Sequence, residues 1–419
     1  MLPIIGVLII LVTIYAIIKR YETRLVLFTA GLAMCLIALD PMAAFNQFQT
    51  SMTNAGLIKS ILSVMGFAYV MKLTKCDQHL VHLVAGFITR FRAILIPLTV
   101  LATWIINIPL SSAAGCAAAV GAILIPVLMS AGVHPAVAAA AVLAGTFGSV
   151  LSPGNSHVVM VAEMSGLPEI QVIYTVAAAA AVTGLIGAIV LTIVARIRKE
   201  DRGYQAEISA EDTDFQVSIA KALVPIVPLV LLIVGSLPRF SEIGLNVATC
   251  MLIGTIVALV VTRSNPAEVT KAFFDGMGKA YGDVMGIIIA AGVFTAGLAS
   301  VGLIDMLLNS LTGAKSAIGA AATWGPFLVA VLSGSGDAAT IAFNQAVTPH
   351  AANFGLTIQA VGTLASLAGA LGRSMSPVAG ACIVVSGIAK VNPMEVAKRN
   401  MPGMILASIV AFIMMGLAL

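Results

Sequence analysis

The chain has 419 residues, of which 60% are hydrophobic and only 10% are charged. A soluble domain carries about 25% charged and about 45–50% apolar residues, so this composition excludes a soluble enzyme, a nucleic-acid-binding protein and a disordered scaffold. The mean hydropathy of +1.06 indicates an all-α polytopic membrane protein, with room for roughly ten spans of about 20 residues each. A β-barrel is disfavoured because the apolar runs are continuous rather than alternating.

Apolar segments in chain order predict the spans. The first segment is followed, not preceded, by positive charge at Lys19 and Arg20, so it is expected to be a retained span and not a cleaved signal peptide. A polar, charged segment at 199–221 divides the chain and predicts a cytoplasmic linker. The expected spans lie near residues 3–18, 24–40, 57–74, 135–165, 170–195, 222–238, 244–262, 283–301, 357–388 and 394–418.

Two further apolar blocks, 93–131 and 315–353, do not fit as single spans. Each has two apolar arms of about 16 residues, which is short for crossing about 30 Å of hydrocarbon. A re-entrant helical hairpin, whose tip lies inside the protein at membrane depth, explains both the length and the polar centre. Two complete short spans remain the alternative. The polar centres read Ser111-Ser112-Ala113-Ala114-Gly115 and Ser333-Gly334-Ser335-Gly336-Asp337.

Positive charge predicts the orientation. If the N-terminus lies outside, Lys59, Arg239 and Lys315 are the only cations on the outer side, and nearly all the others fall on the inner side, as the positive-inside rule requires. Both termini are then periplasmic or extracellular. One cation fits neither side, because Arg373 lies inside an expected span.

The two halves of the chain resemble each other. Ser152-Pro153 and Ser376-Pro377 are 224 residues apart, and the same shift places Ser111 on Ser335. Residues 1–198 and 222–419 each predict five spans, one of them broken, and one hairpin. Five crossings is an odd number, so the second half is expected to be inverted relative to the first. Inverted repeats with broken helices at the midplane are typical of secondary transporters.

Four polar breaks interrupt the apolar helices: the two hairpin tips and the segments around the two Ser-Pro pairs. Such breaks leave free amides and carbonyls that lipid cannot satisfy, and helix N-termini favour anions. We therefore expect a substrate site there, although kinks that serve packing alone are the alternative. The predicted binding residues are Ser111, Ser112, Asn155, Ser156, Ser333, Gly334, Ser335, Gly336, Arg373, Ser374 and Ser376.

Arg373 is the most informative of these residues. A charge at membrane depth is costly unless it is paired, and a guanidinium can hold a carboxylate bidentately. A structural ion pair with Asp337 is the alternative. Asp337 could instead carry a proton or bind Na⁺, and His157 could titrate or simply pack as a hydrogen-bonded histidine. Asp337 and His157 are thus the candidates for ion coupling.

Two other classes of function, an intramembrane protease and a metal-binding protein, match parts of the sequence less well. Gly334-Ser335-Gly336-Asp337 matches the GxGD string of intramembrane aspartyl proteases, but such an enzyme needs a second aspartate, for which Asp283 is the only plausible partner. His79 and His82 could bind a metal, but they lack a third ligand. The five cysteines are scattered singly and predict neither a disulfide framework nor a zinc site. No cofactor or metal is therefore expected.

The C-terminal run from Gly372-Arg373-Ser374-Met375-Ser376-Pro377 to Asn392-Pro393 and Glu395-Val396-Ala397-Lys398-Arg399 resembles the DcuC family of anaerobic C4-dicarboxylate carriers. The second tip, from Ser333 to Asp337, is similar to that family's Gly-Ser-Gly element, except that the family usually has Asn in place of Asp337. The resemblance implies fumarate, succinate, malate or aspartate as substrate, an inner-membrane homodimer and an elevator-type motion.

These observations predict a secondary active transporter of small organic dianions. In each half, the hairpin, broken span and last span are expected to form the moving domain. The first three spans of each half, with arms near 76–92 and 303–314, are expected to form the scaffold and dimer contacts. A carrier of another anion, such as a hydroxycarboxylate, is the alternative.

Overall fold

The computed structural model describes residues 2–19, 21–88, 90–91, 94–205, 215–237, 239–304, 306 and 315–417. Within these residues the chain is helical and contains no strand, and many large apolar side chains, such as Ile4, Leu11 and Val260, are exposed on the helices. Both features confirm an all-α polytopic membrane protein. In the described part of the chain, six helical stretches are long and apolar enough to cross a membrane: Ala55–Thr74, Ala113–Ser130, Pro135–Ser165, Glu169–Ile197, Pro266–Ser300 and Pro393–Gly416. The other expected spans fall on shorter apolar helices, so the count of ten stays a prediction.

The first part of the chain contains one helix that the apolar pattern did not predict. Between α2 and α4, Asp40 caps a polar helix, α3, whose first residue is Pro41. Aspartate before proline is a strong helix start, but the polar sequence of α3 hid it from a search for spans. The helices here are α1 (Leu2–Ile18), α2 (Thr23–Ile37), α3 (Pro41–Met52), α4 (Ala55–Thr74) and α5 (Cys76–Ile88).

The first hairpin block consists of two helices that pack against each other, and a broken helix and a long helix follow it. The tip between the paired helices is at residues 107–112. The elements are α6 (Leu95–Ile106), α7 (Ala113–Ser130), α8 (Pro135–Gly145), η2 (Gly148–Leu151), α9 (Ser156–Ser165) and α10 (Glu169–Ile197).

After the linker, the span expected at 283–301 is longer than predicted. It begins at Pro266 and runs through a π-turn, η5, to Ser300. Charged residues on one face of α14 hid this extension, while Val269 and Phe273 on the other face are buried. The elements are α11 (Ile219–Leu223), η3 (Val224–Ile226), α12 (Val227–Gly235), η4 (Ser241–Ile243), α13 (Val247–Thr262), α14 (Pro266–Ala280), η5 (Tyr281–Met285) and α15 (Gly286–Ser300).

The last part of the chain follows the order of the first hairpin region. Two packed helices meet at Ser335, and a broken helix and a final helix follow. The arm expected at 303–314 falls mostly outside the described residues. The elements are α17 (Lys315–Ser333), α18 (Gly336–Ala346), η6 (Thr348–Phe354), α19 (Ile358–Arg373), α20 (Gly380–Ala389), α21 (Pro393–Ala411) and η7 (Phe412–Gly416).

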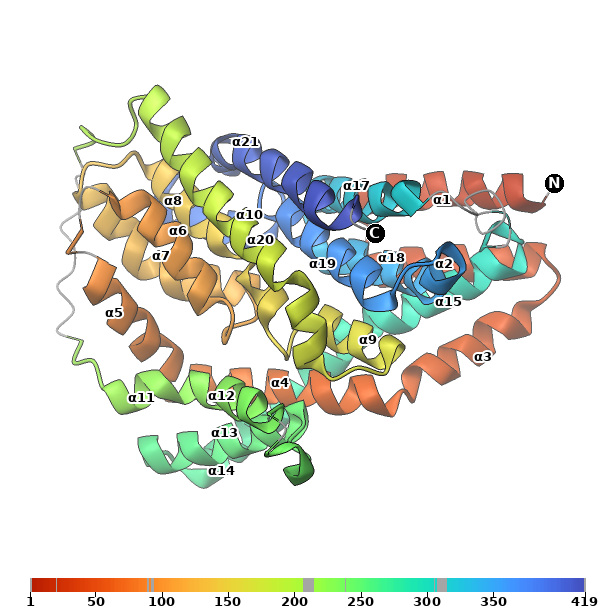
Figure 1. Cartoon of the computed structure of the whole chain (residues 1–419), viewed down its shortest axis with the longest axis horizontal. Helices are drawn as coiled ribbons and strands as arrows, with labels where there is room; N and C mark the ends of the chain where they lie inside the picture. Colours follow the sequence, from red (N-terminus) through yellow and green to blue (C-terminus); the bar gives the residue numbers. More distant parts are fainter. Residues whose placement is uncertain are drawn as a thin grey trace.

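Three main bodies of buried side chains organise the helices of the described part of the chain. One core joins α6, α7, α8 and α10 to α17, α19, α20 and α21, so it contains the first hairpin, one arm of the second hairpin and parts of both broken helices. A second core lies mainly among α1, α2, α4 and α15, with residues of α9 and α18, and a third lies mainly among α4, α12, α13 and α14. In Figure 1, α4 runs below the first group, with α13 and α14 beneath it. The charged cluster described below lies where these bodies meet.

Candidate functional site

The second hairpin tip lies directly against the second helix break. Gly334 has φ +76°, a conformation that favours glycine, and a Cβ there would approach the backbone carbon of Val378 to 2.7 Å. A Cβ on Gly336 would lie 2.9 Å from the carbonyl oxygen of Gly369 and 3.3 Å from Cβ of Arg373. The Gly-Ser-Gly sequence therefore allows the tip to approach the backbone of the broken helix closely.

The first hairpin tip is held against the first break by Asn107. The side-chain oxygen of this fully buried residue accepts the Ser149 N–H at 2.8 Å, and its amide donates to the carbonyl of Leu110 at 2.8 Å. A small cavity beside the tip is lined by Ser111, Ser152 and residues of α4. Asn107 was not among the predicted site residues, because an asparagine inside an apolar arm has no distinguishing pattern.

Two polar contacts join the halves of the chain at the breaks. Arg373, at the end of α19, donates from Nη2 to the carbonyl oxygen of Thr146, at the end of α8, at 2.9 Å. Asp337, in the first turn of α18, lies with Oδ1 2.9 Å from Nε2 of His157, in the first turn of α9. The predicted residues Arg373, Asp337 and His157 thus meet in one central cluster, although they are up to 216 positions apart in the sequence.

Arg373 is incompletely satisfied in this cluster. Its Nε is buried without a hydrogen-bond partner, and no carboxylate among the described residues forms an ion pair with its guanidinium. Asp337 is close enough for electrostatic attraction, but its direct partner is His157. The alternative of a direct Arg373–Asp337 ion pair is therefore absent from this arrangement.

The predicted serines and Asn155 lie at the breaks and mostly bond to their own helices. Ser112, Asn155 and Ser335 are N-caps of α7, α9 and α18, each accepting a backbone N–H. Capping uses a side-chain oxygen as acceptor, so the hydroxyl and amide hydrogens remain available to a ligand. Ser156 begins α9 and is partly buried. The hydroxyls of Ser333, Ser374 and Ser376 bond to Val329 O, Ala370 O and Val378 N.

The helix N-terminus that follows the second break has no side-chain cap. Ala379 precedes α20 and offers no capping oxygen, and the space around a Cβ on Gly380 is open. The first amides of α20 therefore lack the partner that caps α7, α9 and α18. Free amides at a helix N-terminus attract anions.

A cavity of about 500 Å³ lies between α3, α4, α9, α15, α18 and η6. Gln345, which lines it, is eight residues after Asp337 on α18, which places it about 12 Å further along the helix. Much of the lining is polar, and part of it comes from α3, the helix that the sequence did not predict. The polar lining residues are Gln47, Thr50, Ser51, Asn54, Glu163, Thr295, Gln345 and His350.

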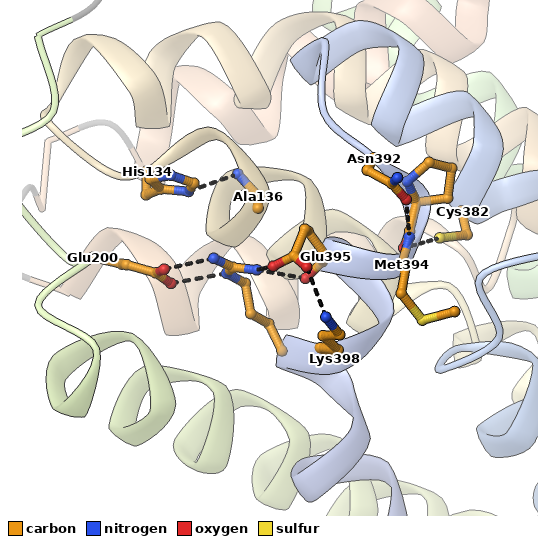
Figure 2. A network of polar contacts seen from close by, with 10 residues as sticks. His134, Ala136, Glu200, Cys382, Asn392, Met394, Glu395 and Lys398 are labelled. Carbon is orange, nitrogen blue, oxygen red and sulfur yellow. Dashed lines mark hydrogen bonds and ion pairs between the residues drawn. The ribbon is translucent and has the colours of Figure 1, made fainter.

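A second charged cluster lies at the start of α21. Arg399, only 3% exposed, donates from Nε to Glu200 at 2.8 Å and from Nη1 to the carbonyl and carboxylate of Glu395. Figure 2 shows Glu200 and Glu395 on opposite sides of that guanidinium and Lys398 beside Glu395. The His134 N–H also donates to the carbonyl of Glu200 at 2.9 Å. This cluster fastens the beginning of the linker to α21 and to the α7–α8 turn.

The residues of the two minor alternatives lie elsewhere and have other partners. Asp283 is exposed and pairs with Lys279 at 3.0 Å, so it is not paired with Asp337. His79 accepts the Ser218 N–H at 3.2 Å, and the ring of His82 stacks on Phe215. Burial lowers the pKa of both imidazoles. The two histidines thus hold the end of the linker on α5.

Broken apolar helices that meet around a charged cluster define a polytopic membrane transporter. Two solved transporter structures share the fold. The antimetabolite efflux pump MtrF of Neisseria gonorrhoeae aligns with a TM-score of 0.62 at 13% identity, over 90% of this chain and 83% of that one. The YdaH transporter of Alcanivorax borkumensis aligns with a TM-score of 0.60 at 16% identity, over 89% and 86%.

The chain belongs to the DcuC family, described as C4-dicarboxylate anaerobic carriers, whose profile matches residues 1–419. The anaerobic C4-dicarboxylate transporter DcuC of Escherichia coli K12 is 25% identical over 429 aligned residues, 94% of this chain and 92% of that protein. An uncharacterized transporter of Haemophilus influenzae is 44% identical over 271 residues, 62% of this chain and 97% of that protein. The family resemblance is confirmed. The protein is a multi-pass inner-membrane transporter and not an enzyme, which removes the protease alternative.

Proposed function

We propose that this protein is a secondary active transporter of C4-dicarboxylates and that the substrate binds at the central cluster. The observation that supports this most directly is the incomplete pairing of Arg373, whose buried Nε has no partner. A guanidinium at membrane depth that lacks a carboxylate within the protein is suited to bind one from a substrate. The uncapped N-terminus of α20 and the hydroxyl and amide hydrogens of Ser112, Asn155 and Ser335 add neutral donors at the hairpin tips and helix breaks.

We further propose alternating access by an elevator-type motion. The core that α6, α7, α8 and α10 share with α17, α19, α20 and α21 supports a rigid moving body that includes parts of both hairpins and both broken helices. Two separate cores, one mainly of α1, α2, α4 and α15 and the other mainly of α4, α12, α13 and α14, support a scaffold with its own packing, against which α9 and α18 lie. The matching order of elements in the two halves supports the inverted repeat. A homodimer, formed through the scaffold, belongs to the same proposal.

Uptake into proteoliposomes tests the proposed function. We expect concentrative or exchange uptake of labelled fumarate, succinate, malate or aspartate, with competition among them. Lactate and citrate, offered at the same concentration, should compete weakly. If lactate or citrate is taken up and none of the four C4-dicarboxylates competes with it, the alternative substrate class is correct and the proposed one is wrong.

The orientation needs its own test. The charge distribution predicts both termini outside and the 199–221 linker in the cytoplasm. Ser209, in the linker, and Leu419, at the C-terminus, would report the two sides, but both lie outside the described residues. Tyr204 and Glu242 are therefore chosen as the positions for single cysteines. In a background without the five native cysteines, Tyr204→Cys should resist an impermeant thiol reagent in intact cells, and Glu242→Cys should react. The opposite pattern would refute the orientation.

A further inference from the structure

The pair between His157 and Asp337 has an uneven exposure. The His157 side chain is 5% exposed, whereas the Asp337 side chain is 62% exposed, and one carboxylate oxygen reaches the ring from this open side. The Asp337 carboxylate therefore lies between the imidazole and the accessible space. A carboxylate of an incoming substrate would approach His157 from the place that Asp337 now occupies.

The imidazole is held by a single polar partner. Nε2 faces Asp337, and Nδ1 is buried without any hydrogen-bond partner. A buried N–H without an acceptor is costly, so the arrangement favours the neutral ring with its proton on Nε2, donating to Asp337. If Asp337 withdraws, this N–H loses its only acceptor, and a second carboxylate can replace it at the same atom.

Whether a substrate carboxylate can replace Asp337 beside His157 depends on the net charge of the cluster. Arg373 and Asp337 carry opposite charges, so the empty cluster is neutral when His157 is neutral. A dianion added to this cluster would place two uncompensated negative charges at membrane depth, next to a third carboxylate of Asp337. A proton on Asp337 removes the like-charge repulsion at the exchange position. It leaves one net negative charge beside the N-termini of α9, α18 and α20, which stabilise anions.

Resting on the function proposed above, we propose that Asp337 occupies the position of one substrate carboxylate in the empty site. Protonation of Asp337 frees the Nε2–H of His157, which keeps its proton, to donate its hydrogen bond to the substrate carboxylate instead. His157 and Arg373 then bind the two carboxylates of the dianion. The proton comes from the aqueous side, binds to the Asp337 carboxylate and travels with the substrate, so one proton accompanies each dianion.

The donor chemistry favours a proton over Na⁺ as the coupled ion. Hard cations are bound by oxygen ligands, and the direct partner of Asp337 is a ring nitrogen. Asp337 interacts electrostatically with His157 and Arg373. The other titratable groups on the elements packed against α9 and α18 are Lys59, Tyr69, Lys72, Glu163, Glu169, Tyr174, Arg196, Lys315 and His350.

Fumarate is the probe for the test, because both of its carboxyl groups are ionised near neutral pH. Calorimetry of fumarate binding in buffers of different ionisation enthalpy measures the protons taken up by the purified full-length protein. We expect about one proton per fumarate for the unmodified protein and about none for Asp337→Asn, which mimics the protonated carboxyl permanently. Binding to Asp337→Asn should also become independent of pH, and fumarate uptake should no longer respond to a pH gradient.

Two further variants separate this exchange from a structural role. His157→Ala removes a hydrogen bond to a carboxylate of fumarate. It should therefore raise the KM for fumarate by about 10- to 100-fold. Because Asp337 then lacks its donor, the pH at which uptake falls to half should move upward. Asp283→Asn and His82→Gln are the matched controls, and both should keep the proton count and pH profile of the unmodified protein.

The outcomes distinguish this inference from the proposed function. If the unmodified protein transports fumarate but takes up no proton, or requires Na⁺ instead, the exchange is wrong and the transporter assignment stands. A proton count and pH profile that persist in Asp337→Asn would also overturn it. If Asp337→Asn fails to fold, Asp337→Glu replaces it, and fumarate uptake by this variant must still depend on pH. Asp283→Glu is the matched control and should show the same pH dependence as the unmodified protein. If the folded unmodified protein transports no C4-dicarboxylate at any pH, the proposed function itself fails.

Discussion

Arg373 and Arg399 are two arginines with opposite degrees of pairing. Arg399 is bound by the carboxylates of Glu200 and Glu395 and by a backbone carbonyl. Arg373 has a single backbone carbonyl as hydrogen-bond partner and a buried Nε with none. The protein thus supplies Arg399 with carboxylate and carbonyl acceptors, whereas Arg373 keeps an N–H donor without an acceptor.

The contrast separates structural from functional charge. A buried ion pair rarely adds much net stability, but breaking it by removing one partner is strongly destabilising. The Arg399 cluster is therefore structural: it holds the linker, α21 and the α7–α8 turn together. Buried polar atoms in native proteins normally have partners, and the unpaired Nε of Arg373 is an exception that a bound carboxylate would explain.

Replacing Arg373 should have the largest effect on transport. Arg373→Ala leaves a desolvated substrate carboxylate without its partner, at a cost of about 3–5 kcal/mol, equivalent to a loss of more than about 100-fold in transport efficiency. Folding should change little, since only one hydrogen bond to Thr146 is lost. Uptake of labelled succinate, with the melting temperature of the purified protein as control, measures both effects.

Arg373→Lys tests the geometry of the same contact. The ammonium keeps the charge but loses the planar, bidentate fork, so we expect a loss of transport nearly as large as in Arg373→Ala. Near-normal affinity for succinate in the folded Ala variant would show that Arg373 is structural and that the proposed binding site is misplaced.

Replacing Arg399 should reverse the pattern. Arg399→Met leaves Glu200 without its buried partner and should destabilise the fold by about 3–5 kcal/mol, while the surviving folded protein keeps its KM for succinate. Adding Glu200→Gln should restore part of the stability, because the uncompensated charge is removed. Chemical denaturation in detergent provides the measurement. A stable Arg399→Met protein with abolished transport would place Arg399 in the mechanism and end the contrast.

Removing a neutral donor at the second tip should have a smaller effect than removing Arg373. Ser335→Ala loses the N-cap of α18, which costs about 0.5–2 kcal/mol of stability. It also removes one hydroxyl donor, worth about 0.5–1.5 kcal/mol in substrate affinity. We expect a modest rise in KM, read from succinate uptake. A loss as complete as that of Arg373→Ala would mean that the hydroxyl, and not the guanidinium, dominates binding.

Lys398→Gln should have the smallest effect. Lys398 pairs with Glu395 at the exposed edge of the Arg399 cluster, and exposed ion pairs contribute little. Neither the melting temperature nor the uptake of succinate should change measurably. A clear loss of stability would show that the cluster depends on its exposed members as well as on Arg399.

The fold was predictable where helical breaks carry a local signal. Proline, glycine and serine in apolar runs mark the tips and breaks, and the structure has helix ends at Ser112, Asn155, Ser335 and Arg373. Helix α3 and the first part of the long helix at Pro266 were not predictable from continuous apolar runs, because the first is polar and the second is apolar on one face only.

The candidate site was predictable in its members but not in its pairs. Arg373, Asp337 and His157 were each conspicuous as polar residues in apolar surroundings. The sequence favoured Asp337 as the ion-pair partner of Arg373 if either was structural, whereas the structure pairs Asp337 with His157. Asn107 and Thr146 carried no signal, because one contributes through its position beside Ser149 and the other through a backbone carbonyl.

The sequence by itself determined the membrane class, the family, the helix breaks and the charges that had to be buried. These follow from hydrophobic burial, backbone hydrogen bonding and the cost of charge in hydrocarbon, which act on local stretches of chain. Only the tertiary structure decided which charges are saturated. Arg373 and Arg399 are both single arginines in helical sequence, and their difference depends on partners about 200 residues away, brought into contact by the packing of distant helices.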